Sequence, residues 1–391
     1  MENIKILYIL SSTMMGGATL SALTLIEQMS NRGCRVFVVS PNMIPQFQMK
    51  LEKLGVSWYK VNFRFHAYPR VKDKLYRLKF PIRIIRLLFI NYKAKNEIAN
   101  IILKNGIDIV HTNVGPIECG FKACLKVKVP HVWHIREYGD KDFNIHMFPS
   151  QKDFRNLLKK SYVISITKEL IYYNNLESSS TAHVIYNGVR KKADVRYEYP
   201  KKKYFLCASR VSPEKGFVQT IRVFAQFHNS HPDYKLIIIG LDPNNYTPTL
   251  KKMAKDCGVV DAIEFGGFKE NVSDYMAHAT ALIVSSPYEG FGRMTAESAF
   301  AGCLVVGKNV AGTKEIMKII GGYPFVTDEE MLSSLEEVCS LSEKEYQEKA
   351  LYAQSQAVSC FSEESYIDKV FNLYKLIVNQ KRRTCYPKVM L

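Results

Sequence analysis

Short runs of apolar residues alternate with longer stretches of helical periodicity along most of the chain. The runs are nearly continuous in hydrophobic side chains, which is typical of strands buried on both faces of a parallel sheet. In the first half they predict strands over Ile4–Leu10, Arg35–Ser40, Ile107–Thr112, His131–Ile135, Tyr162–Ile166 and His183–Tyr186. In the second half they predict strands over Tyr204–Ala208, Lys235–Gly240, Ala262–Phe265, Ala281–Ser285 and Leu304–Gly307. The predicted fold class is therefore α/β.

A polar segment separates the two halves. Residues 190–194 are mostly charged, and a proline followed by three lysines at 200–203 precedes the next predicted strand, as expected of a linker. A chain of 391 residues suits two domains of about 150–200 residues each. We predict an N-terminal domain over 1–188, a C-terminal domain over 189–362, and a final segment over 363–391. The helix of that segment is expected to pack back toward the N-terminal domain and to end in a basic tail.

The net charge of +17 is unevenly distributed. Ten Lys and Arg residues lie between Arg64 and Lys95, where the only acid is Asp73. Such a surface attracts the phosphate groups of lipids, nucleic acids or substrates, although no nucleic-acid-binding motif accompanies it. Within this window, Phe80–Ile90 mixes cations with large apolar side chains. The pattern fits a helix in a membrane interface and equally an ordinary helix with one core face.

Cysteine usage and hydropathy indicate the cellular compartment in which the protein is expected. The nine cysteines form no CxxC pair and no metal-ligand spacing, which favours buried free thiols in a reducing compartment. The apolar run at Ile4–Leu10 is too short for a signal peptide and lacks a basic flank. No apolar stretch reaches the roughly 18 residues that a membrane-spanning helix needs. We therefore expect a cytoplasmic protein.

Ligands in open parallel sheets bind beyond the carboxyl ends of the strands, so the loops that follow the strands are candidate sites. Gly16-Gly17 follows the first predicted strand and precedes a helical pattern. Glycines there let the backbone approach a ligand, and a helix N-terminus favours negative charge. The pair does not complete a GxGxxG fingerprint, which disfavours a dinucleotide site. A simple strand-to-helix turn explains it equally well.

Two loops in the second half carry stronger candidates. Residues 209–216 hold Arg210 and Lys215, whose cationic donors suit phosphate oxygens, although a solvated loop in which Glu214 pairs with a neighbour is an alternative. Residues 285–297 combine a strand end, a glycine-rich loop and a helix start near Met294. The amides of Gly292–Thr295 would point out of that helix toward a phosphate. Nearby carboxylates, Glu289 and Glu297, can accept hydrogen bonds from sugar hydroxyls.

Together these segments resemble the retaining glycosyltransferases of family 4, which have the GT-B fold: two Rossmann-like domains whose parallel sheets face each other across a cleft. The resemblance extends over most of the chain and rests on Gly16-Gly17, His134, Asn187-Gly188-Val189, Ser209-Arg210, Glu214-Lys215-Gly216, Glu289-Gly290-Phe291-Gly292, Glu297, Gly312 and Glu315. It implies an acceptor bound by the N-terminal domain and a nucleotide-sugar, a UDP-sugar rather than a GDP-sugar, bound by the C-terminal domain. It implies no metal and no cofactor besides this donor substrate.

The resemblance also assigns roles to residues. Arg210 and Lys215 would hold the donor diphosphate, Glu289 would contact the transferred sugar, and His134 would lie near the reacting sugar; these four are the candidate catalytic residues. The donor would further contact Gly16, Gly17, Ser209, Phe268, Gly290, Phe291, Gly292, Arg293, Met294, Thr295 and Glu297, the last through the ribose hydroxyls. The chain departs from the family's common pattern at Arg136, Ser298 and Cys303.

Three functions therefore stay open. The first is transfer of a sugar to a glycan or lipid-linked acceptor in cell-surface polysaccharide or lipopolysaccharide assembly, at the inner face of the cytoplasmic membrane and without nucleic acid. The second is another GT-B nucleotide-sugar enzyme, such as an epimerase, and the third is a non-enzymatic binder of anionic surfaces. Asp140-Lys141-Asp142 fits a DxD metal signature, but the resemblance implies no essential metal.

Overall fold

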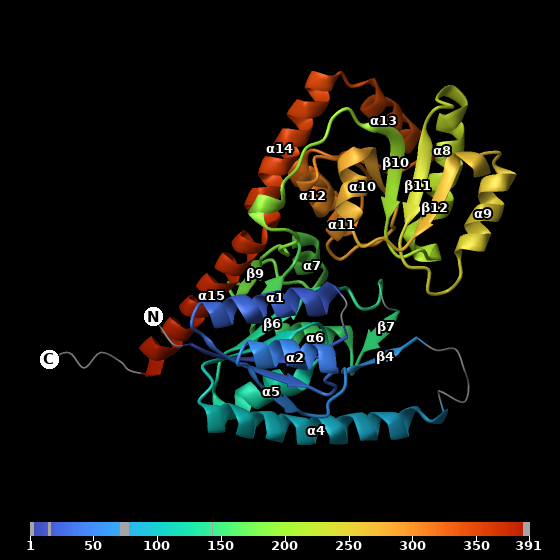
Figure 1. Cartoon of the computed structure of the whole chain (residues 1–391). Coiled ribbons are helices and arrows are strands. Elements are labelled where there is room, and N and C mark those ends of the chain that lie inside the picture. Colours follow the sequence, from blue (N-terminus) through green and yellow to red (C-terminus); the bar gives the residue numbers. More distant parts are fainter. Residues whose placement is uncertain (1–3, 15–16, 71–77, 143, 386–391) are drawn as a thin grey trace. The chain divides into compact units, whose positions relative to one another are not determined.

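The computed structural model describes residues 4–14, 17–70, 78–142 and 144–385 (Figure 1). The chain forms two compact units, of which the first comprises residues 1–185 and 367–391 and the second comprises residues 186–366. Each unit is built around one parallel sheet. The final helix, α15 (Glu363–Cys385), begins in the second unit and continues in the first.

The first unit contains a seven-stranded sheet in the order β3-β2-β1-β5-β6-β8-β9, in which every neighbouring pair is parallel. Its strands are β1 (Lys5–Leu10), β2 (Arg35–Ser40), β3 (Ser57–Lys60), β5 (Ile109–Asn113), β6 (His131–Ile135), β8 (Tyr162–Ser165) and β9 (Ala182–Val184). Its helices before α15 are α1 (Gly17–Asn31), α2 (Pro45–Lys53), α4 (Phe80–Asn105), α5 (Glu118–Val127), α6 (Gln151–Leu158) and α7 (Lys168–Tyr173). A separate antiparallel pair joins β4 (Ala67–Pro69) to β7 (Ile145–Met147).

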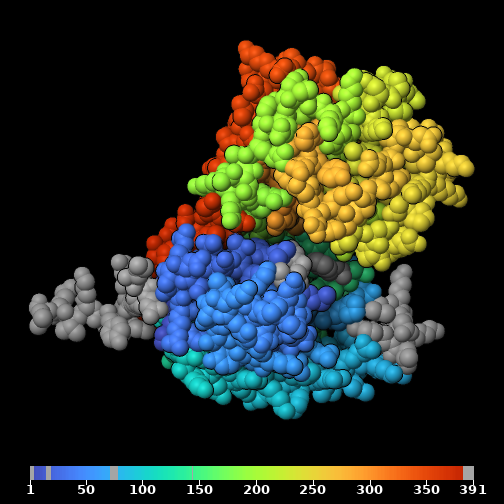
Figure 2. Space-filling view, in the orientation of Figure 1, coloured from blue at the N-terminus to red at the C-terminus, as the bar shows by residue number. Residues whose placement is uncertain are grey.

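Helices cover both faces of this sheet. On one face α4 packs Ile98 and Ile102, and α5 packs Ala123, into one core with Leu7 and Phe37 of the inner strands (Figure 1). The blue surface seen in the space-filling view is formed by α1 and α2 (Figure 2). Because both faces are covered, the strands β1 and β2 are almost entirely apolar, which made them predictable, whereas β5 and β6 also bury polar side chains such as His111 and His134.

The second unit repeats the design with a six-stranded sheet in the order β12-β11-β10-β13-β14-β15. Its strands are β10 (Lys202–Ala208), β11 (Lys235–Ile239), β12 (Ile263–Gly267), β13 (Ala279–Val284), β14 (Leu304–Lys308) and β15 (Tyr323–Phe325). Its helices are α8 (Phe217–Ser230), α9 (Thr247–Asp256), α10 (Val272–His278), α11 (Arg293–Phe300), α12 (Ala311–Ile320), α13 (Asp328–Ser340) and α14 (Glu343–Phe361). Along β10, Phe205 and Cys207 pack into one core, and Leu206 and Ala208 pack into the core on the opposite face.

In both sheets the strand order reverses next to the first strand of the unit. The reversal lies between β1 and β5 in the first sheet and between β10 and β13 in the second. A crevice opens beyond the carboxyl ends of the strands at such a point, and ligands of open α/β sheets bind there. The loop with Arg210 follows β10 and the loop with Glu289 follows β13. The topology therefore places the two strongest sequence candidates on either side of the second reversal.

All eleven predicted strands are present, with ends shifted by one or two residues in most cases. Four short strands were not predicted: β3, β4, β7 and β15. β15 contains Pro324 and β4 ends at Pro69, and proline lacks the amide that a ladder needs. β3 has exposed ends and no continuous apolar run. Each of these strands is stabilised by its pairing with another strand of its sheet, and no local sequence signal marks that pairing.

Candidate active site

The loops after β10 and β13 pack against each other, beyond the point where the strand order of the second sheet reverses. Gly216 adopts a left-handed backbone conformation with φ of 75°, and a Cβ on it would lie 2.3 Å from the carbonyl oxygen of Ser285. Only glycine permits this approach. The hydroxyl oxygens of Thr220 and Ser285 lie 2.6 Å apart. The segment that carries Lys215 is therefore fixed against the loop that leads to Glu289.

Two ion pairs occupy the predicted phosphate clamp. Lys215 Nζ lies 2.5 Å from Glu289 Oε1, and both side chains are largely buried. Arg210 Nη2 lies 2.7 Å from Glu214 Oε1, where both side chains are more than half exposed. The pairing of Glu214 is the alternative that the sequence left open. An exposed pair of this kind contributes little free energy, so Arg210 can leave it for a stronger anion at little cost.

The N-terminus of α11 presents unsatisfied donors beside this clamp. Gly292 precedes the helix in a left-handed conformation, with φ of 82°, and provides no side-chain cap for the first amides. The buried hydroxyls of Thr295 and Thr313 have no hydrogen-bond partner among the described residues. Each would lie 3.3 Å from a Cβ on Gly292. Helix amides and two free hydroxyls at one point suit an anionic oxygen.

Glu297 is buried on the same helix and is held by two guanidinium groups. Arg293 Nε lies 2.5 Å from Glu297 Oε1, and Arg190 Nη2 lies 2.8 Å from Glu297 Oε2. Each oxygen keeps a second acceptor direction for a ligand hydroxyl. Arg190 and Thr313 are site residues that sequence reasoning missed. Arg190 follows Asn187-Gly188-Val189, which belongs to the resemblance, and that adjacency was the available signal.

A cavity of about 230 Å³ opens beside Arg210 and brings four predicted residues together. Its lining includes Ser209 and Arg210 after β10, Phe268 after β12, and Met294 at the start of α11. A Cβ on Gly240 at its wall would lie 1.7 Å from Ser209 O, so the position requires glycine. An apolar slot with an exposed phenyl ring suits the flat face of a nucleobase.

Other predicted donor contacts have structural roles as well. The Phe291 ring is buried and its centroid lies 5.8 Å from that of the Phe361 ring, so it anchors the loop. Gly290 lies in the same loop. Gly17 begins α1, whereas Gly16 lies outside the described residues.

In the first unit, His134 lies at the end of β6 and is fully buried. Its Nδ1 is 3.2 Å from Nε2 of His111 and 3.4 Å from Nη2 of Arg136. Burial, followed by the charge of Arg136, lowers the pKa of both histidines well below the usual value, so both are neutral. Next to them, burial and then Asp142 raise the pKa of Glu137 to about 7.

The DxD-like triplet has structural partners. Asp142 accepts hydrogen bonds from the backbone amides of Tyr138 and Gly139 at 2.8 and 2.7 Å, and Asp140 accepts one from the Tyr173 hydroxyl. These bonds stabilise the loop after β6. Within the described part of the chain, no cluster of His, Cys, Asp or Glu has the geometry of a metal site.

The basic window forms the first half of α4 and the segment before it. Lys72, Lys74 and Arg77 lie outside the described residues. Large apolar side chains of α4 are exposed among the remaining cations: Ile82, Ile85, Leu88, Phe89 and Tyr92. Among the described residues, no helix has the length and hydropathy required to cross a membrane.

Comparisons with known proteins agree with this geometry. Residues 189–348 match the family model described as "Glycosyl transferases group 1". An "Uncharacterized 42.6 kDa protein in cps region" of Klebsiella pneumoniae is 26% identical over 63% of this chain and 69% of its own length. A GDP-mannose-dependent alpha-(1-6)-phosphatidylinositol monomannoside mannosyltransferase of Mycobacterium tuberculosis is 29% identical over 34% of this chain. That match spans 36%, about a third, of the mycobacterial protein.

A solved structure extends the likeness to the whole chain. The crystal structure of Anabaena HepE in complex with UDP-glucose superposes with a TM-score of 0.71 at 18% identity, covering 95% of this chain and all of that one. Two parallel α/β sheets with this strand order and this structural neighbour establish the GT-B fold. The matched residues 189–348 of the second unit belong to the group 1 glycosyltransferases, family GT4, and the protein is a glycosyltransferase.

Proposed function

We propose that this protein transfers a sugar from a UDP-sugar to a glycan or lipid-linked acceptor during assembly of a cell-surface polysaccharide or lipopolysaccharide. The observation that carries the proposal is the pair of unpartnered hydroxyls, Thr295 and Thr313, at the N-terminus of α11. They adjoin the loop of Glu289, which is paired with Lys215. Amide dipoles, hydroxyls and a cation at one point match the charge of a nucleoside diphosphate.

Each residue then has a role in the reaction. The donor diphosphate draws Arg210 from Glu214 and Lys215 from Glu289, and the freed Glu289 accepts hydrogen bonds from the transferred sugar. The cations stabilise the negative charge that builds on the departing diphosphate. Glu297 accepts from the ribose hydroxyls, and the base lies against Phe268. The His134 side chain contacts the reacting sugar. The acceptor hydroxyl attacks on the leaving-group face and passes its proton to a phosphate oxygen of the departing diphosphate, so the anomeric configuration is retained.

Thermal stabilisation tests the donor class directly, because a ligand that binds the folded state raises its stability. UDP-glucose, GDP-mannose and an ADP-sugar are compared at equal concentrations. We expect the UDP-sugar to raise the melting temperature most, and the Thr313→Val variant to lose most of that shift while melting near the native temperature. A larger shift with GDP-mannose, the donor in the name of the mycobacterial relative, would contradict the choice of base.

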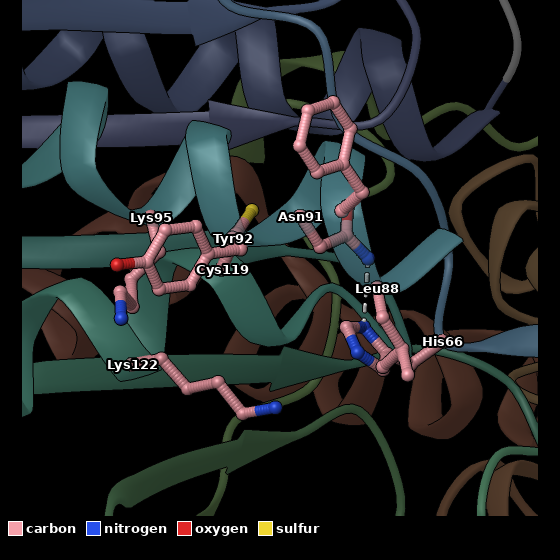
Figure 3. Close-up of a pocket in the computed structure, with 8 residues that line it drawn as sticks. His66, Leu88, Asn91, Tyr92, Lys95, Cys119 and Lys122 are labelled. Atoms are coloured by element: carbon pink, nitrogen blue, oxygen red, sulfur yellow. Dashed lines mark hydrogen bonds between the residues drawn. The ribbon is translucent and has the colours of Figure 1, made fainter. Parts of the chain in front are cut away.

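The acceptor is expected at an anionic membrane surface, on the exposed face of α4. The pocket between α4 and α5 supports this assignment (Figure 3). It has a volume of about 510 Å³. Its polar lining groups already have partners: the buried Asn91 Nδ2 lies 3.0 Å from His66 Nδ1, and the partly exposed Lys122 Nζ lies 2.6 Å from Oε2 of the buried Glu118. A ligand in this pocket would therefore contact mainly the apolar rim and the adjacent cations.

That rim is amphiphilic. Leu88, Phe89, Tyr92 and Lys95 line it, and Lys93 lies over the Phe89 ring at 4.4 Å. Apolar side chains among cations suit the boundary between lipid headgroups and acyl chains. Each cation that reaches an anionic leaflet contributes about 1 kcal/mol of binding free energy. The protein is therefore proposed to attach reversibly to the cytoplasmic leaflet.

Flotation with phosphatidylserine vesicles at low and high salt tests this attachment. We expect binding at low salt, and a large reduction when Lys79, Arg83 and Arg86 are replaced by Gln, with donor-induced thermal stabilisation unchanged. Replacement of Lys251, Lys252 and Lys255 of α9 by Gln is the matched control. Equal loss in both triple variants would indicate a nonspecific effect of net charge, and no flotation at low salt would exclude membrane attachment.

A further inference from the structure

A buried chain of hydrogen bonds in the first unit connects α15 to the end of β6. The Tyr374 hydroxyl of α15 lies 2.5 Å from Nδ1 of His111 on β5 and 3.1 Å from the Tyr8 hydroxyl of β1. His111 Nε2 in turn lies 3.2 Å from His134 Nδ1. All four side chains are fully buried. Each neutral imidazole and each phenol can both donate and accept a hydrogen bond. These four groups alone would therefore permit the bonds to be donated in either direction, from Tyr374 toward His134 or the reverse.

Arg136 determines the direction in which the hydrogen bonds of this chain are donated. Its guanidinium can only donate, and Nη2 lies 3.4 Å from His134 Nδ1. Nε of the same group donates to Asn113 Oδ1 at 2.8 Å, which fixes the orientation of the guanidinium plane. His134 Nδ1 must therefore accept, because an N–H there would face a cationic donor. His111 Nε2–H then donates to His134, and His111 Nδ1 accepts from Tyr374.

We propose that Tyr374 and His111 are positioning residues that hold His134 as the Nε2–H tautomer, so that this ring meets the reacting sugar as a hydrogen-bond donor and not as a base. The inference rests on the proposed function for the identity of the ligand, but the tautomer follows from the geometry alone. A neutral ring also fits its surroundings, since burial and the charge of Arg136 lower the pKa of His134.

The first test reads the tautomer without any ligand. The full chain is labelled with ¹⁵N-histidine, and the ring signals are assigned by their loss in the His111→Asn and His134→Gln variants. We expect both rings to carry the proton on Nε2, and to remain neutral from pH 8 to pH 5. A protonated Nδ1 on His134, or a ring that gains a second proton near pH 6.5, would overturn the proposal.

The second test separates positioning from a general loss of stability. Tyr162 provides a matched control, because its hydroxyl also donates to α15, at 2.7 Å from Gln380 Oε1, and makes no hydrogen bond to a histidine among the described residues. With UDP-glucose hydrolysis as the readout, we expect Tyr374→Phe to lower kcat about tenfold with KM unchanged, as for one lost hydrogen bond to a buried polar group. Tyr162→Phe should stay within twofold of the native rate. Equal losses in both variants would overturn the proposal.

A conservative replacement completes the test. Gln at position 134 places an amide N–H near the position of Nε2, whereas Asn places its amide near Nδ1. We expect His134→Gln to hydrolyse UDP-glucose about tenfold faster than His134→Asn, and the reverse order would contradict the assigned donor. If UDP-glucose is not hydrolysed at all, the kinetic comparison is made with the UDP-sugar that gives the largest thermal shift, and the ¹⁵N measurement decides the tautomer independently.

Discussion

Replacement of Gly312 by alanine is the sharpest perturbation of the candidate site, because the new atom would meet backbone and not a flexible side chain. The added Cβ would lie 2.7 Å from the carbonyl carbon and oxygen of Phe291 and 2.8 Å from Glu289 O. Ordinary contacts begin at 3.4 Å. The loop must therefore retreat by about 0.6–0.7 Å, and it is also tied to Gly312 by a 2.9 Å bond from Gly312 N to Glu289 O.

This displacement acts directly on the position of Glu289 and its partner Lys215. Because a misplacement of about 1 Å can cost roughly 10²-fold in rate, we expect turnover to fall by about 10–10²-fold. Overpacking should also lower the free energy of unfolding by about 1–3 kcal/mol. Steady-state kinetics with the best donor from the thermal screen, measured well below the melting temperature, give the first quantity, and urea denaturation gives the second.

Gly322→Ala is the control for this prediction. Its Cβ would lie 2.9 Å from Cγ of the buried Met317 and 3.3 Å from Val305 O, and not against the donor loop. We expect a modest loss of stability with normal turnover. If Gly312→Ala is folded and turns over within twofold of the native protein, the loop does not position catalytic groups as argued here.

Three further outcomes are expected. Arg210→Ala or Lys215→Ala should lower turnover by roughly 10²–10³, as for one lost electrostatic donor, and near-normal steady-state rates in both would remove the phosphate clamp. Arg190→Met should weaken donor binding in calorimetry, because Glu297 loses one of two guanidinium partners; unchanged affinity would show that Arg293 alone orients this carboxylate. Glu137 is protonated more readily in the folded state, so its own contribution to stability should be lost as pH rises from 4.5 to about 7, against the opposite contribution of buried histidines such as His111 and His134; Glu137→Gln should therefore make stability rise more steeply with pH in urea titrations, and an unchanged pH dependence would contradict this.

Stereochemistry provides an independent check on the proposed reaction. NMR of the first-formed product should show the anomeric configuration of the donor. An inverted product would refute attack on the leaving-group face and would require a general base opposite the departing diphosphate.

The sequence predicted those parts of the fold and site whose signal is local. Buried parallel strands are recognisable because both faces are apolar, and the clamp residues are recognisable because they follow strand ends. Lys215 and Glu289 lie 74 positions apart, yet each sits in its own recognisable loop, and the structure brings them within 2.5 Å. Strand order then explains why these two loops are neighbours.

Residues whose role depends on a distant partner were not predictable in this way. Arg190 is one cation in a charged stretch until the buried Glu297, 107 positions later, is found beside it. Thr313 is one hydroxyl among many until its lack of a partner beside Gly292 is seen. The bond between Tyr374 and His111 spans 263 positions and has no sequence signature. Each of these roles exists only in the folded packing.

The membership of α15 in the first unit has a consequence for the order of folding. A ribosome delivers the seven-stranded sheet first and α15 after every strand of the second unit has been made. Until then Tyr8 and His111 lack their contact with the Tyr374 hydroxyl, and the loss of one hydrogen bond at a buried polar group destabilises an intermediate. The half of the protein that is synthesised first is therefore the half that is completed last. Nascent chains shortened before α15 should expose that surface to chaperones, although both sheets are already encoded in them.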